Sequence, residues 1–344
     1  MLAHAIIASA RQAWPPFVLV AGLLLIGAVA AADGLFEALG ALLARTSLGA
    51  RSLLLTLLAL VAVVTAILNL DTSVVFLTPV LVHAARQRGL DERPFLYGSV
   101  FMANAASLLL PGSNLTNLVV LRSDPQGGAA FARAMLPAWI AACAITTAFL
   151  MLAFRLKHGV HDPDEPPALR LTLGAASTLI AGALVLLLRN AALPVLAVGV
   201  AVALLRKLRP RLDTRALALL FGLAVALGTL ARLWTGPGHL LDSRRPWETA
   251  GIGVAASILI NNLPAAVLLS AQPPLHPHAL MLGLDIGPNL AITGSLSAIL
   301  WLQAARRVGA TPSIATYSRL GLPLVALTLL ATLAVQWLGP LASF

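Results

Sequence analysis

The stretch ILINNLPAAVLLSA, from Ile258 to Ala271, places two asparagines and a proline inside an otherwise apolar run. A backbone that is interrupted at membrane depth leaves N–H and C=O groups free, and such groups persist only where protein or a water-filled cavity satisfies them. The stretch therefore predicts a membrane segment that is broken beside a polar site in the protein interior.

The composition of the whole chain is that of a membrane protein. Of its 344 residues, 59% are hydrophobic and 10% are charged, and the mean hydropathy is +0.91, whereas roughly 25% of residues are charged in soluble domains. The net charge of +10 comes from Lys and Arg that lie singly or in small groups between apolar runs, which is typical of membrane loops and argues against nucleic-acid binding. The single cysteine, Cys143, is too few for a disulfide framework or a thiolate metal site within the chain.

Ten apolar runs divide the chain, and six of them are uninterrupted. The six are predicted to be ordinary membrane spans: Phe17–Ala32, Met135–Phe154, Leu171–Leu188, Ala191–Leu205, Ala216–Leu230 and Tyr317–Trp337. The other four carry a break: Ser52–Ala84 at Asn69–Asp71, Phe95–Leu121 at Pro111–Asn117, Thr249–Ala271 at Asn261–Pro264, and Ala279–Leu302 at Asp285–Asn289. Because breaks are costly in lipid, each one is expected to face the interior.

The breaks resemble one another in pairs. NLDTSVVFLT from Asn69 aligns with NLPAAVLLS from Asn262, and GSNLTN from Gly112 aligns with GPNLAI from Gly287. In both halves an apolar span is followed by an Asn-containing break, a Gly-x-Asn-Leu break and a second span. We interpret this order as an internal repeat, and inverted repeats with discontinuous helices are a common architecture of secondary transporters.

The sequence thus predicts an all-α polytopic membrane protein with two inverted repeats, each with a re-entrant hairpin and a broken transmembrane helix. The predicted first repeat covers 1–157, with a span, hairpin 52–84, broken helix 95–121 and span 135–154. A linker and two extra spans cover 158–215. The predicted second repeat covers 216–344, with a span, hairpin 249–271, broken helix 279–302 and span 317–337.

The distribution of Lys and Arg is consistent with this topology. If each hairpin leaves the membrane on the side that it entered, sixteen of the 23 Lys and Arg lie on one side and seven on the other. The larger group indicates the cytoplasmic side, so the predicted protein lies in the cytoplasmic (inner) membrane with both termini outside. The alternative for the N-terminus is a cleaved signal peptide, because Arg11, an apolar stretch and the AVA of Ala28–Ala30 fit that pattern.

Four segments carry a family resemblance. NLDTSVVFLTPV from Asn69, PGSNLTNL from Pro111, INNLPAAV from Ile260 and DIGPNLAITGSLSAILW from Asp285 resemble the signature segments of ArsB-type arsenite efflux permeases. These permeases belong to the ion transporter superfamily, which also includes citrate and dicarboxylate carriers and NhaD-type sodium/proton antiporters. The resemblance implies that the two hairpin tips and the two helix breaks meet at one substrate site.

Carried over by position, the resemblance and the breaks give twelve candidate substrate-binding residues: Asn69, Thr72, Ser73, Ser113, Asn114, Thr116, Asn117, Asn261, Asn262, Asn289, Thr293 and Ser295. The alternative for each is a local hydrogen bond to freed or helical backbone. Asn104 is interpreted as an interhelical hydrogen-bonding residue.

Two acidic residues, Asp71 and Asp285, lie at breaks within apolar runs. An ionisable group at membrane depth is by default a functional candidate, so both are predicted to couple transport to protons. The alternatives are that Asp71 caps the helix that begins at Thr72 and that Asp285 lies near a membrane face and caps the following turn.

We therefore predict a secondary transporter, not an enzyme, that exports arsenite or antimonite in exchange for protons. Amide and hydroxyl groups suit a small neutral trihydroxy acid. The alternatives are a sodium/proton antiporter and a citrate- or dicarboxylate-type organic-anion transporter, with a channel or scaffold as a different class. No cofactor and no metal are expected, since His276 and His278 are interpreted as loop residues, and proton or sodium is the coupling ion. The expected partners are the bilayer, a small inorganic or organic substrate, a second copy in a homodimer and, because no nucleotide-binding loop is present, a possible separate ATPase subunit.

Overall fold

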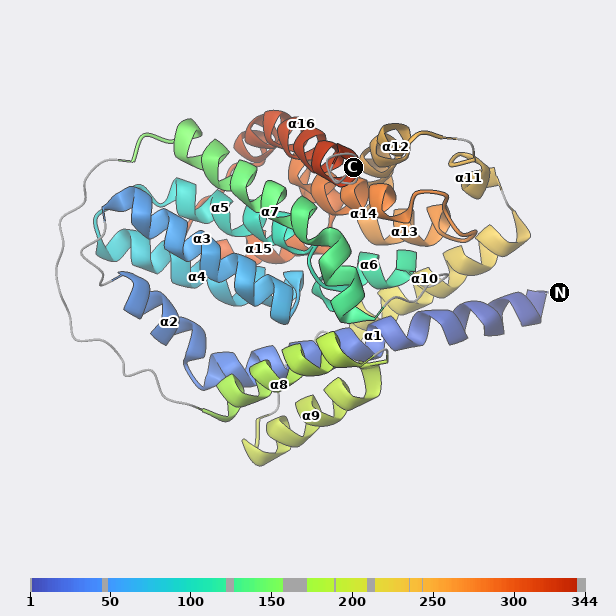
Figure 1. The fold of residues 1–344 in the computed structure, drawn as a ribbon. Helices are drawn as coiled ribbons and strands as arrows, with labels where there is room; N and C mark the ends of the chain where they lie inside the picture. The colour runs from blue at the N-terminus through green and yellow to red at the C-terminus, as the bar shows by residue number, and fades with distance from the viewer. Residues whose placement is uncertain are drawn as a thin grey trace.

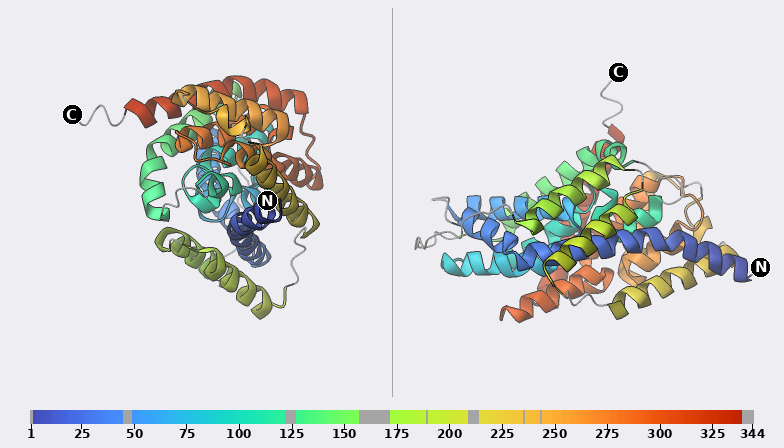
Figure 2. Two further views of the ribbon diagram at one scale, coloured as in Figure 1. Left: turned by 90° about the vertical axis from the view of Figure 1, so that its right-hand side faces the viewer. Right: turned by 90° about the horizontal axis from the view of Figure 1, so that it is seen from below.

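The structure is a computed structural model that describes residues 2–44, 49–121, 127–156, 172–188, 190–208, 214–234, 236–242 and 244–338. All regular elements within these ranges are helices, and most run along one direction, horizontal in Figure 1, so that the left view of Figure 2 looks along many of them. Four are long and apolar enough to cross a membrane: α1 (Leu2–Ala32), α3 (Ala50–Ile67), α7 (Gly128–Ala153) and α16 (Ile314–Leu338). The expected helical, multi-pass class is confirmed.

The predicted breaks coincide with helix ends. The first hairpin consists of α3 and α4 (Leu70–Gln87), and the second of α12 (Pro246–Ile260) and α13 (Asn262–Leu269). Two interrupted segments follow these hairpins. In the first half they are α5 (Arg93–Ala106), η1 (Pro111–Ser113) and α6 (Leu115–Val120), and in the second half α14 (Pro277–Ile286), η3 (Gly287–Leu290), η4 (Ile292–Gly294) and α15 (Leu296–Arg307).

The two hairpins lie toward opposite sides of the protein. In Figure 1 the α3–α4 pair occupies the left part and the α12–α13 pair the right part. The two halves also interlock, because α15 of the second half packs against α4 and α5 of the first, and α16 packs against α7. The order of hairpin, interrupted helix and long helix therefore recurs, while the inverted relation of the halves and the residue boundaries of the repeats stay predictions.

Helix α1 connects the two halves with the extra spans. It packs against α8 (Leu173–Leu187), α9 (Ala192–Leu205) and α10 (Thr214–Leu233). Its contact with α9 depends on glycines, because a Cβ on Gly22 would lie 2.7 Å from the backbone nitrogen of Leu196 and one on Gly199 would lie 2.7 Å from the Gly22 carbonyl oxygen. Small residues of this kind let membrane helices approach closely.

Two features of this region depart from the sequence prediction. Helix α1 starts at Leu2, fifteen residues before the predicted span, and it continues through Pro15 and Pro16; the polar residues before Phe17 had diluted the apolar signal. The short helix α2 (Leu35–Ala44) was not predicted. Between α1 and α2, the side chain of Asp33, which is 4% exposed, pairs with Arg206 and accepts a hydrogen bond of 2.7 Å from the Gly174 amide at the start of α8. These contacts hold the extra spans against α1.

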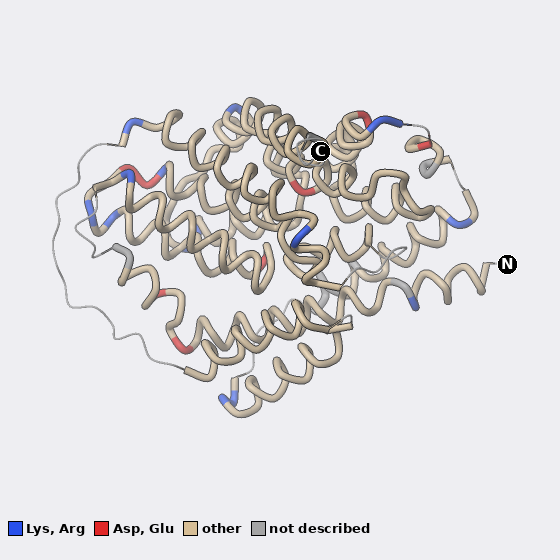
Figure 3. Tube along the Cα trace, in the orientation of Figure 1, with Lys and Arg blue, Asp and Glu red and all other residues tan. Residues whose placement is uncertain are grey.

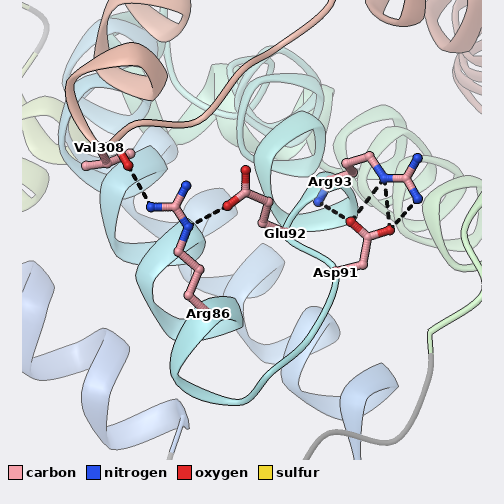
Figure 4. A network of polar contacts seen from close by, with 5 residues as sticks. All are labelled: Arg86, Asp91, Glu92, Arg93 and Val308. Carbon is pink, nitrogen blue, oxygen red and sulfur yellow. Dashed lines mark hydrogen bonds and ion pairs between the residues drawn. The ribbon is translucent and has the colours of Figure 1, made fainter.

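Lys and Arg lie mainly at helix ends and in connections, as Figure 3 shows. One such group joins the turn after α4 to the end of α15 (Figure 4). Arg86 donates from Nε to Glu92 Oε2 at 2.5 Å and from Nη1 to the Val308 carbonyl oxygen at 2.6 Å. Because Val308 caps α15, this network ties the first hairpin to the second half outside the apolar region.

The neighbouring Asp91–Arg93 pair gives a prediction about acid stability. The guanidinium of Arg93, which donates to Asp91 Oδ2 from Nη2 at 2.7 Å, holds the pKa of the Asp91 carboxyl below its ordinary value of 3.8. A depressed pKa stabilises the fold above the unfolded-state pKa, and this contribution is lost as pH falls through the folded-state pKa. Since the pair is largely exposed, Asp91→Asn should cost at most about 1 kcal/mol.

The measurement is thermal unfolding of wild type and Asp91→Asn in detergent at pH 6 and at pH 2.5. We expect the variant to melt slightly earlier at pH 6 and together with wild type at pH 2.5. A difference of equal size at both values would contradict an ionic origin. Glu37→Gln, at an exposed acid of α2, is the matched control.

Candidate functional site

The tip of the first hairpin presents a capped helix start and a carboxyl group. Asn69 is extended and its Oδ1 accepts a hydrogen bond of 2.7 Å from the Thr72 amide, so Asn69 is the residue that caps α4. The capping role considered for Asp71 is therefore wrong. Asp71 instead accepts a hydrogen bond of 2.5 Å from Ser297 Oγ, in the first turn of α15, which links the first hairpin to the interrupted helix of the second half.

The second carboxyl group pairs with a side-chain amide, and this pair joins the two interrupted helices. Asp285, near the end of α14, is fully buried, and its Oδ1 accepts a hydrogen bond of 2.9 Å from Nδ2 of Asn114 in the first-half break. Asn117 and Ser107 lie beside the same carboxyl group. No helix start following Asp285 uses its side chain as a cap, so the structure does not support the alternative of a turn cap near a membrane face.

Further amides cross between the same two breaks. Asn104 donates from Nδ2 to Asn289 Oδ1 at 2.7 Å, and Asn289 Nδ2 donates to the Phe101 carbonyl oxygen at 3.4 Å. Within the first half, Asn117 Nδ2 donates to the Ser107 carbonyl oxygen at 2.8 Å. Asn104 thus forms the predicted interhelical bond, and its partner is one of the candidate site residues.

The tip of the second hairpin is more open. Asn261 has a φ of 77° and a ψ of 148°, a strained backbone conformation that residues other than glycine rarely adopt, and its Oδ1 accepts a weak hydrogen bond of 3.4 Å from the Leu263 amide. Its Nδ2 donates at 3.1 Å to the carbonyl oxygen of Thr293, an exposed residue in η4. Asn262 is buried. The second tip therefore contacts the break of its own half.

Local bonds account for two of the candidate hydroxyl groups. Ser113 Oγ bonds the Leu110 amide at 3.0 Å and the Leu110 carbonyl oxygen at 2.8 Å, and Ser295 Oγ accepts from the Ala298 amide at 3.2 Å as the cap of α15. These two side chains stabilise the breaks themselves. Their proposed contact with substrate has no support in the hydrogen bonding.

Several buried polar atoms around the breaks have no hydrogen-bond partner among the described residues. They are Asn69 Nδ2, Thr72 Oγ1, Ser73 Oγ, Asn104 Oδ1, Thr116 Oγ1, Asn117 Oδ1 and Asp285 Oδ2. A buried polar group without a partner carries a desolvation cost of about 1–3 kcal/mol. A polar ligand or water is the ordinary remedy for such a cost, so these atoms make the breaks a candidate binding region.

Two contributors to the site were missed in the sequence. Ser297 bonds Asp71, and Ser107 lies beside Asp285. Both are single serines in apolar stretches, a pattern that also fits a serine bonding its own helix. The one signal in the sequence was proximity to residues already singled out, because Ser107 lies close to Asn104 and Ser297 lies close to Ser295.

The charges of the site are the two carboxyl groups. None of the ion pairs formed among the described residues involves Asp71 or Asp285, and no group of three His, Cys, Asp or Glu that could hold a metal occurs in the part of the chain that the structure describes. His276 lies beside Trp337 and His278 beside Phe131. The site thus offers amides, hydroxyls and two acids that can exchange protons.

Comparisons with known proteins place the chain among membrane transporters. Residues 2–287 match the model of the CitMHS family, described as a citrate transporter. Arsenical pump membrane proteins of Yersinia enterocolitica and Escherichia coli K12 are 27% and 26% identical to this chain, over 88% of it and 81% of each relative. The silicon efflux transporter LSI3 of Oryza sativa is 33% identical over 39% of this chain and 28% of its own length. The solved YdaH transporter of Alcanivorax borkumensis superimposes with a TM-score of 0.60 at 16% identity, over 98% of this chain and 88% of that one.

Proposed function

Because the chain belongs to the CitMHS family of membrane transporters, as the match over residues 2–287 shows, we propose that it is a secondary transporter that exports arsenite or antimonite across the cytoplasmic membrane in exchange for protons. The observation that carries the proposal is that the lining of the breaks holds no paired cation among the described residues. Amide and hydroxyl groups surround two carboxyls, and no Lys or Arg is paired with them among the described residues.

This lining favours a neutral hydroxy acid over a carboxylate dianion. Undissociated arsenite presents three hydroxyl groups, which both donate and accept hydrogen bonds, and an asparagine side chain does the same. Anionic carboxylates are bound most strongly by charged donors such as arginine. The arsenical pump relatives align with 88% of this chain, and their names point to arsenic oxyacids as the substrate class.

Asp71 is the proposed coupling group of the first hairpin. The Asp71 carboxyl accepts a hydrogen bond of 2.5 Å from the Ser297 hydroxyl. This bond is strong when the carboxyl is ionised, and protonation removes the charge that makes it strong. Loading a proton therefore loosens the link between α4 and α15, and unloading restores it. The two states of this link are what a proton-driven alternation between outward and inward access requires.

The second candidate is transport of an organic anion, which the description of the family model favours. The starts of α4, α13 and α15 all lie at breaks, and helix N-termini attract anions. A sodium/proton antiporter would use the same two aspartates. The homodimer and the separate ATPase subunit stay predictions.

The test is uptake into everted vesicles with an imposed proton gradient, for wild type, Asp71→Asn and the control Glu37→Gln. We expect arsenite uptake in wild type and in Glu37→Gln, and this uptake should collapse when the gradient is removed. In Asp71→Asn it should fall about tenfold or more, which corresponds to the loss of one charge-assisted hydrogen bond. Silicic acid, citrate and sodium are tested in parallel. Gradient-driven citrate uptake without arsenite uptake, in vesicles that contain folded protein, would overturn the proposal in favour of the second candidate.

A further inference from the structure

A hollow separate from the breaks opens between α3 and α7. Its volume is about 450 Å³ and its lining is almost entirely apolar. The small side chains of Ala59, Ala144 and Ala148 leave the space, and Leu58 and Met102 form its buried floor. Both walls are helices long and apolar enough to cross a membrane, so the hollow lies at the depth of the lipid hydrocarbon.

The hollow is open toward the outside of the bundle. On the α3 wall, Leu55 and Val63 are 49% and 51% exposed. Along α7 the lining runs from Trp139 to Met151, which at 1.5 Å per residue is about 18 Å. The hydrocarbon core is about 30 Å thick, so the hollow is about as deep as one leaflet.

Two arginines flank one end of the hollow. Arg51 is the second residue of α3, one helical turn before Leu55, and Arg155 follows the end of α7, four residues after Met151. Figure 1 shows that α3 begins and α7 ends on the same side of the protein. Both arginines are exposed, and neither forms an ion pair with another described residue.

We propose that this hollow binds one acyl chain of an anionic phospholipid whose phosphate lies between Arg51 and Arg155. The apolar lining and the one-leaflet depth fit an acyl chain, and guanidinium groups at the polar end fit a phosphate. The charge distribution assigns this end to the cytoplasmic side, where anionic lipids attract basic side chains. A transmembrane helix, about 10 Å across, is too wide to enter a hollow between two adjacent helices, which argues against a second copy as the occupant.

Trp139 provides a probe, because it lines the hollow and is half-buried. The full chain is placed in nanodiscs with brominated phosphatidylglycerol or brominated phosphatidylcholine, and the quenching lost in Trp139→Phe isolates the signal of this residue. We expect phosphatidylglycerol to quench Trp139 at lower mole fraction than phosphatidylcholine. Arg51→Gln and Arg155→Gln should each reduce that preference by about fivefold, from about 1 kcal/mol per basic residue, while Arg306→Gln, at an exposed arginine of α15, leaves it unchanged.

Native mass spectrometry supplies the second readout, which needs no tryptophan variant. Wild type should retain phosphatidylglycerol, and Ala144→Leu with Ala148→Leu, which fills the hollow, should lose it. Equal quenching by the two lipids, insensitive to both arginines, would show ordinary lipid contact only and would overturn the proposal. Unquenched Trp139 in a protein of dimer mass would overturn it as well, in favour of a second copy on this face.

Discussion

Asp285→Asn is expected to abolish proton-driven accumulation of arsenite while leaving exchange of arsenite across the membrane measurable. The substitution keeps the shape of the side chain and an oxygen that can accept the 2.9 Å hydrogen bond from Asn114. It removes the one carboxyl group that the described residues place at the junction of the two interrupted helices, which is the proposed proton-exchanging group. Coupling and binding are thereby separated, because an amide can hold the junction together but cannot load and release a proton.

The size of the expected effect follows from the burial of Asp285. This side chain is 0% exposed, and an amide in its place can neither load nor release a proton. Gradient-driven uptake should therefore fall to the level seen without a gradient. Exchange of labelled for unlabelled arsenite, measured at equal pH on both sides, should change far less.

Two further variants test the role of the carboxyl group itself. Asp285→Asn combined with Asn114→Asp moves the acid to the other side of the same hydrogen bond and should recover part of the gradient-driven uptake. Glu37→Gln, which removes an exposed acid from α2, should behave as wild type. Full gradient-driven uptake in Asp285→Asn would exclude Asp285 as a coupling group and leave Asp71 as the remaining candidate.

The sequence predicted the breaks well because their signal is local. An asparagine, glycine or proline inside an apolar run is costly in lipid unless the interior uses it. Helices α4, α6 and α13 do start directly after Asn69, Asn114 and Asn261, while Asn289 lies inside η3, just after the end of α14. The order of hairpin and interrupted helix in both halves followed from the same signal. Helix α2 was missed because it is short and lies just past a longer apolar run.

The pairings between the breaks were not predictable in the same way. Ser297 and Asp71 are 226 residues apart, and Asn104 and Asn289 are 185 apart. Nothing in a local pattern distinguishes a serine that bonds an acid in the other half from one that bonds its own helix. The polar residue types at the breaks were thus predictable, whereas their hydrogen-bond partners required the packing of α15 against α4 and of α5 against α14.

The last prediction concerns how the second break is held in place. Gly321, in α16, lies directly against the backbone of η3, and a Cβ at this position would be 1.9 Å from the Asn289 carbonyl oxygen and 2.8 Å from its carbonyl carbon. Nearby, Tyr317 donates from its hydroxyl to the Pro288 carbonyl oxygen at 2.9 Å. Backbone atoms cannot rotate aside as a side chain does, so Gly321→Ala must push α16 and the break apart.

We expect Gly321→Ala to lower the stability of the protein by roughly 3 kcal/mol, the upper end of overpacking costs, and to reduce arsenite uptake strongly, because displacing Asn289 breaks its 2.7 Å bond with Asn104. The matched control is Gly251→Ala in α12, where an added Cβ meets no atom within 4 Å. There the higher helix propensity of alanine should leave stability unchanged or raise it by up to about 1 kcal/mol. Thermal unfolding in detergent and vesicle uptake are measured for both variants. Equal melting temperatures and equal uptake would show that the close contact between α16 and η3 does not position the break.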